Sequence, residues 1–76
     1  MEIVLTKHAQ ERCELRGINL EMIKDTIINP EKRSKGYKER LLAFKKYEDR
    51  FLKVVYVIEE NKYIIITAIW EERKQE

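Results

Sequence analysis

Three basic side chains, His8, Arg12 and Arg16, recur every four residues in the stretch KHAQERCELRGI, residues 7–18. At about 100° per residue, a helix places them in one row. A planar guanidinium can make two hydrogen bonds to one phosphate, and an imidazole can move a proton near neutral pH. The row therefore indicates a phosphate-binding surface on which His8 is the proton-transfer group.

The same row also admits an architectural interpretation. It runs through the side of the helix that should pack, because the apolar residues Ala9, Cys13 and Leu15 lie on that side. Arginine stems can pack on a sheet while their charged ends pair with acids at its rim, such as Glu59 or Glu71. The sequence leaves both interpretations open.

Two short helices are expected before Pro30. Thr6 can cap the start of the first helix, and Gly17 suits the left-handed position that ends it. Asn19 can cap the second helix, whose apolar residues recur at helical spacing and which should stop before the proline.

The later part of the chain has the alternating pattern of strands. Residues 31–39 are polar and are interpreted as a loop or a ragged edge hairpin. Asn61 can adopt the left-handed conformation of a tight turn between the last two strands. Strands are predicted at residues 2–5 (or an ordered lead-in), 40–47, 51–59 and 62–72. The order β-α-α-β-β-β predicts a single α+β domain over residues 1–76, with both helices on one face of an antiparallel sheet.

The two longest strands are apolar on both of their faces. In a sheet with one solvent-exposed face, apolar and polar residues would alternate more regularly along each strand. Two helices can cover only one face. The other face is therefore predicted to be a groove, a partner site or a homodimer interface. The sequence does not assign residues to faces, because the turn at Glu60–Asn61 allows two registers.

Charge is unevenly distributed along the 76 residues, whose net charge is +2. Residues 35–54 carry seven basic and three acidic side chains, hence +4. This segment is either an anion-binding patch or an ordinary lysine- and glutamate-rich surface. The single cysteine cannot form an internal disulfide, and no stretch approaches the roughly 20 apolar residues of a membrane span. The expected location is the cytoplasm, with no membrane contact.

Two stretches together resemble a known group of proteins. LTKHAQERCELRGI is similar to the signature of a small family grouped with the RelE/ParE-like toxins: Thr, any residue, His-Ala, then Arg, and Arg-Gly-Ile at fixed spacing. FLKVVYVIEENKYIIITAIWEERK resembles the C-terminal hairpin of RelE/ParE proteins. The resemblance implies a single RelE-like domain.

The resemblance also implies a function, that of a toxin in a toxin–antitoxin module. Such toxins are metal-independent endoribonucleases that act on mRNA, usually on the ribosome, and need no cofactor. Lys53 matches a basic active-site residue of that family, and Lys46 lies near another. The expected catalytic residues are His8, Arg12, Arg16 and Lys53. The expected RNA-binding residues are Arg40, Lys45, Lys46 and Thr67.

A second function class stays open from the sequence. This chain has Glu72 where RelE enzymes carry an arginine after the last strand. The alternative is a non-catalytic module of the same fold that binds RNA, the ribosome or a protein. RNA or the ribosome, an antitoxin and a second copy of the chain are the partners considered.

Other side chains that could take part in catalysis or binding can also be explained by a purely structural role. Cys13 is expected in the core, and one His with one Cys does not make a metal site. Thr67 is either the polar floor of a cleft or an ordinary strand threonine. The aromatic residues of the strand region either stack on bases or pack; they are Tyr37, Tyr47, Tyr56, Tyr63 and Trp70.

Overall fold

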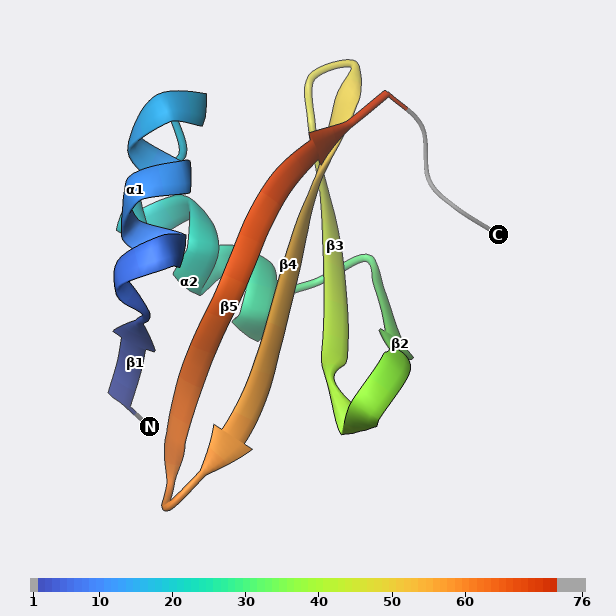
Figure 1. Cartoon of the computed structure of the whole chain (residues 1–76). Coiled ribbons are helices and arrows are strands. Elements are labelled where there is room, and N and C mark those ends of the chain that lie inside the picture. Colours follow the sequence, from blue (N-terminus) through green and yellow to red (C-terminus); the bar gives the residue numbers. More distant parts are fainter. Residues whose placement is uncertain (1, 73–76) are drawn as a thin grey trace.

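The structure, a computed structural model, describes residues 2–72. Two helices lie against a five-stranded sheet whose strand order is β1-β5-β4-β3-β2 (Figure 1). The elements in chain order are β1 (Glu2–Leu5), α1 (Lys7–Arg16), α2 (Leu20–Ile28), β2 (Lys32–Lys35), a 3₁₀ turn (Tyr37–Glu39), β3 (Leu41–Tyr47), β4 (Arg50–Glu59) and β5 (Lys62–Glu71). The predicted α+β class, with two helices followed by strands, is confirmed.

Both helices begin at the predicted caps. The side-chain oxygens of Thr6 and Asn19 accept hydrogen bonds of 3.0 and 2.9 Å from the backbone N–H three residues on. Gly17 ends α1 in the left-handed region at φ 68°, where a residue with a Cβ would be strained. Local capping chemistry therefore sets the helix boundaries.

The prediction of a wholly antiparallel sheet was wrong, whereas residues 31–39 form one of the two predicted alternatives, an edge hairpin with β3. The sheet is mixed rather than antiparallel, because β1 pairs in parallel with the first part of β5. The polar stretch Lys32–Lys35 is a strand, β2, antiparallel to β3 at the edge of the sheet. An edge strand pairs through its backbone and tolerates lysines, so apolar alternation does not reveal it.

The register of the last hairpin decides which residues share a face. Glu60 and Asn61 both have positive φ, 49° and 64°, as the predicted tight turn requires. Val54 lies opposite Ala68 and Tyr56 opposite Ile65, with a register shift between Val55 and Tyr56. The shift inserts one extra residue in β5, a β-bulge that reverses the odd–even alternation along β5, so that Ile65 and Ala68 both face the core.

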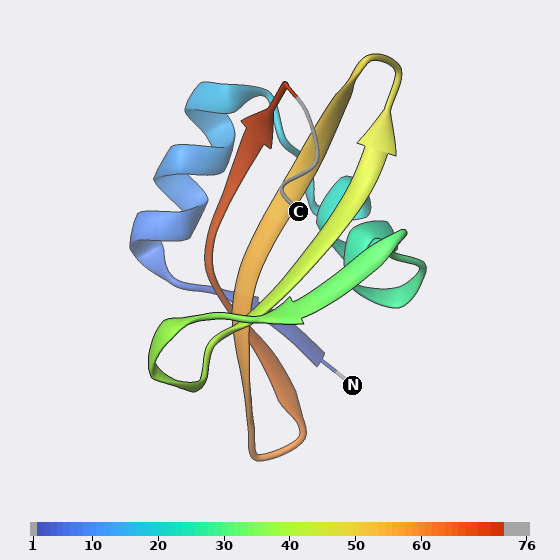
Figure 2. The ribbon, with the colours of Figure 1, turned by 90° about the vertical axis from the view of Figure 1, so that its right-hand side faces the viewer.

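One face of the sheet is covered by the helices and contains the core. Its buried strand residues pack with buried residues of α1, α2 and the segment between them; the cluster is Ala9, Cys13, Ile18, Ile23, Ile27, Ala43, Leu52, Val54, Tyr56, Ile65 and Ala68. Both helices lie on one side of the strands in Figure 1, and α2 lies behind them in Figure 2.

The opposite face, called here the helix-free face, carries no helix of the described residues. By strand alternation and register it consists of Glu2, Val4, Lys32, Ser34, Leu42, Phe44, Lys46, Phe51, Lys53, Val55, Val57, Glu59, Lys62, Ile64, Thr67, Ile69 and Glu71. Most of these side chains are half-buried. The register therefore gives the two longest strands apolar side chains on this face as well, as predicted from the sequence.

Candidate nucleic-acid interface

Three lysines gather at one end of the helix-free face, from three adjacent strands. Lys32 of β2 lies opposite Phe44 of β3, and Phe44 lies opposite Lys53 of β4. Lys46 of β3 lies opposite Phe51 of β4, one row nearer the end of the sheet. Directly opposed residues have Cβ atoms about 5 Å apart, and diagonal neighbours are about 7–8 Å apart. Lys32, Lys46 and Lys53, called here the lysine cluster, therefore share one small area.

Phe44 forms the floor between two of these lysines. Its side chain is 2% exposed although no described helix covers this face. The long aliphatic stems of Lys32 and Lys53 flank it across the strands. The stems of these two lysines therefore rest on an apolar surface.

Lys53 is paired with Glu71 on the same face. Its Nζ lies 3.5 Å from the Glu71 carboxylate, and the two side chains are 24% and 15% exposed. The second carboxylate oxygen, Oε1, is buried without a hydrogen-bond partner. This half-satisfied carboxylate holds Lys53 in place and partly neutralises it, so Lys46 is the more available cation of the two.

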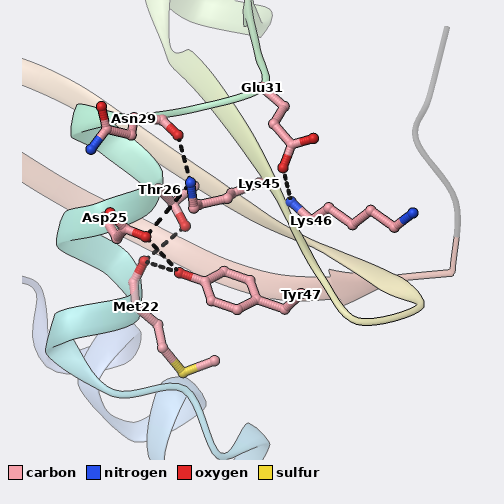
Figure 3. Close-up of polar contacts among 8 residues, drawn as sticks. All are labelled: Met22, Asp25, Thr26, Asn29, Glu31, Lys45, Lys46 and Tyr47. Carbon is pink, nitrogen blue, oxygen red and sulfur yellow. Dashed lines mark hydrogen bonds and ion pairs between the residues drawn. The ribbon is translucent and has the colours of Figure 1, made fainter.

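Strand alternation separates Lys45 from Lys46, although both were predicted to bind RNA. Lys45 points to α2, where its Nζ donates to the backbone oxygen of Asn29 at 2.9 Å and lies 3.6 Å from Asp25 (Figure 3). A cation at the C-terminal end of a helix is favourable there. The Lys46 side chain points the other way and is exposed, while its backbone N–H donates to Glu31 at 2.9 Å (Figure 3). Lys45 therefore stabilises the fold, and Lys46 faces the candidate interface.

The sequence suggested that the basic row of α1 runs through the packing side of the helix. In the structure it does not. Ala9 and Cys13 are buried, whereas His8 and Arg12 are exposed and make no hydrogen bond or ion pair within residues 2–72. Leu15, expected to pack, is 80% exposed. It lies about 200° around the helix from Cys13, which is the centre of the buried side.

Arg16 is the one member of the row that is engaged by the sheet. Its Nη1 donates to the backbone oxygen of Ala68 at 2.8 Å, and the indole N–H of Trp70 donates to the backbone oxygen of Arg16 at 2.9 Å. β1 pairs with β5 only as far as Ile65, so the later part of β5 has a free edge on that side. Arg16 satisfies a carbonyl of this edge. The acid suggested as its partner, Glu71, pairs with Lys53 instead.

The four predicted catalytic residues are not joined by any contact within the described residues. Lys53 lies on the helix-free face of β4, and Arg16 binds the edge of β5. His8 and Arg12 extend from α1 into solvent. The contact made by Lys53, to Glu71, was missed because a glutamate near the end of an apolar strand gives no signal in the sequence.

The remaining predicted RNA-binding residues lie apart from each other. Thr67 is half-buried on the helix-free face opposite Val55. Arg40 is exposed where the 3₁₀ turn meets β3, and its backbone oxygen accepts a 2.7 Å hydrogen bond from Gly36. Thr67 therefore belongs to the candidate interface, and Arg40 lies at the other end of β3 from the lysine cluster.

Most of the aromatic residues pack on the helix-covered side. Tyr56 and Tyr63 meet edge to face at 5.7 Å, and Tyr47 and Trp70 do so at 6.0 Å. Burial raises the pKa of the Tyr56 and Tyr47 hydroxyls, so both stay protonated at neutral pH. Tyr37 is exposed.

The described residues contain no cluster suited to a metal ion, and their one cysteine is buried. No cluster of three or more His, Cys, Asp or Glu side chains within residues 2–72 could hold a metal ion. Cys13 is buried, and burial raises the pKa of its thiol despite the nearby Arg16. Neither described helix is long and apolar enough to cross a membrane.

The sequence matches one family, described as Domain of unknown function (DUF4258), over residues 5–70. The chain belongs to this family. The matched DUF4258 region contains the α1 row and the lysine cluster, and it ends one residue before Glu71. No curated protein and no solved structure matches the chain. The resemblance to RelE/ParE toxins stays a prediction.

Proposed function

We propose that this DUF4258 protein binds single-stranded RNA on its helix-free face and does not cleave it. The observation that carries the proposal is the lysine cluster, in which three adjacent strands contribute a cation to one end of that face. Phosphate contacts supply most of the sequence-independent affinity for nucleic acid. A sheet face with lysines and apolar side chains suits a single strand, because no helix of residues 2–72 projects from it into a groove.

Binding without cleavage is favoured over the endoribonuclease because of where the predicted catalytic groups lie. A metal-independent cleavage needs a proton-transfer group and charge-stabilising groups around one phosphate. Arg16 is committed to the carbonyl of Ala68, and Lys53 to the carboxylate of Glu71. The antitoxin and the ribosome, which the resemblance implies as partners, remain predictions beside this proposal.

Substitution of the lysine cluster is the direct test of RNA binding. For Lys46→Gln, we expect weaker binding to all single-stranded RNA oligomers alike. We also expect the magnitude of the slope of log affinity against log salt concentration to decrease by about 0.7, which is the contribution of one phosphate contact. Fluorescence anisotropy of a labelled oligomer at several salt concentrations measures both quantities.

Lys24→Gln is the matched control, because Lys24 is an exposed lysine of α2 on the other side of the sheet. We expect it to leave the slope unchanged. Equal slopes for Lys46→Gln and the unmodified protein would contradict the proposal. Incubation of the same oligomers with EDTA present should leave them intact, and metal-independent cleavage that is lost in His8→Ala would restore the endoribonuclease hypothesis.

A further inference from the structure

A cavity of about 500 Å³ lies where the β3–β4 hairpin meets the junction of α1 and α2. It is on the opposite side of the sheet from the lysine cluster. Two aromatic rings, one guanidinium and three carboxylates line it; they are Tyr47, Trp70, Arg50, Glu48, Asp49 and Glu72. None of these side chains has a role in the proposal above.

The aromatic wall of the cavity is held in a fixed orientation. The indole N–H of Trp70 donates to the backbone oxygen of Arg16 at 2.9 Å. Tyr47 packs edge to face against the indole, with ring centroids 6.0 Å apart. A ring held in this way forms a rigid wall at little cost in side-chain entropy.

Arg50 lies over this wall with its donors unused. Its guanidinium carbon is 3.9 Å from the centroid of the Trp70 ring, a cation–π contact. Within residues 2–72, the Arg50 side chain makes no hydrogen bond or ion pair. Its planar fork is therefore free to meet two acceptors of a ligand, and a flat ring whose edge meets the fork lies in the guanidinium plane.

Three of the lining side chains are carboxylates, which supply acceptors. Glu48, Asp49 and Glu72 are exposed, and an ionised carboxylate accepts but cannot donate hydrogen bonds. A fitting ligand must therefore have a flat ring, two adjacent donors for a carboxylate and a pair of acceptors for a guanidinium.

We infer that this cavity binds a guanine base. Guanine is the RNA base whose Watson–Crick edge has adjacent N–H and NH₂ donors, and its O6 and N7 are the acceptor pair that arginine recognises. Adenine and cytosine place an acceptor beside their amino group, where it would oppose a carboxylate. Uracil has a single donor between two acceptors.

The cavity lies within reach of an RNA strand on the lysine cluster, and to that extent the inference rests on the proposed function. Tyr47 pairs with Arg50 in the row next to Lys46 and Phe51. Because side chains alternate along β3, Lys46 and Tyr47 face opposite sides at the same end of the sheet. One nucleotide turned around this end would place its base in the cavity while its neighbours stay on the lysines.

Trp70 is the single tryptophan of the chain, so its fluorescence reports on the cavity directly. We expect guanosine monophosphate to quench this fluorescence at a concentration about tenfold lower than the other three nucleoside monophosphates, as one bidentate base contact implies. Arg50→Gln and Asp49→Asn should abolish the preference. Glu60→Gln, at an exposed acid of the other hairpin, is the matched control and should keep it. Equal quenching by all four nucleotides, or by none, would overturn the inference.

A second binding experiment distinguishes failure of this inference from failure of the proposed function. We expect an oligouridine with one central guanosine to bind about tenfold more tightly than one with a central adenosine. Binding of both oligomers with equal affinity would overturn the guanine cavity and leave the RNA-binding proposal standing. Quenching by guanosine monophosphate without binding of any oligomer would support the cavity and overturn the RNA-binding proposal.

Discussion

Phe44→Ala is expected to lower the free energy of unfolding by about 3–5 kcal/mol, the range for a buried phenylalanine. Phe44 is 2% exposed on the face that has no described helix, between Lys32 and Lys53. Its removal leaves a cavity between the two lysine stems that flank it across the strands. Urea denaturation followed by circular dichroism measures the loss.

A domain of this length has a total free energy of unfolding of about 4–11 kcal/mol. If that free energy is at the low end of the range, Phe44→Ala unfolds the protein. Phe44→Leu keeps the test informative, because this smaller apolar change should cost less than the full truncation. Phe51→Ala is the control on the same face, where the ring is half-exposed and the loss should be smaller. Equal, small losses for Phe44→Ala and Phe51→Ala would show that the helix-free face contributes no core of its own.

Arg16→Ala is expected to cost about 1–3 kcal/mol, because it leaves the backbone oxygen of Ala68 without its donor. For a domain of 60–100 residues, each kcal/mol lowers the melting temperature by about 4–8 °C. Arg12→Ala is the matched control in the same row: its side chain is exposed and has no described partner, so the change should stay within about 0.5 kcal/mol.

Thermal unfolding of the two variants, measured beside RNA binding, separates the interpretations of the α1 row. Loss of stability in Arg16→Ala with unchanged RNA affinity would make Arg16 a structural residue of the β5 edge. Unchanged melting temperature in Arg16→Ala would contradict that assignment. A strong loss of RNA affinity in Arg12→Ala would instead support the row as a phosphate-binding surface.

The sequence by itself determined the local elements of this protein. Capping side chains and Gly17 act within a few residues of their own positions, so the helix ends could be predicted. The turn at Glu60–Asn61 and the long strands are local for the same reason. β2 was not distinguished from a loop, because its pairing with β3 depends on backbone hydrogen bonds and not on side-chain pattern.

Only the tertiary structure decided what those elements bring together. The bulge in β5 fixes which side chains share a face, and a shift of one residue would reverse them. Lys45 and Lys46 are identical in type and adjacent in sequence, yet one binds the end of α2 and the other faces the helix-free face. Arg16 finds its partner 52 residues away on an edge that exists because β1 stops at Leu5. Such contacts depend on register and strand order, which no local spacing encodes.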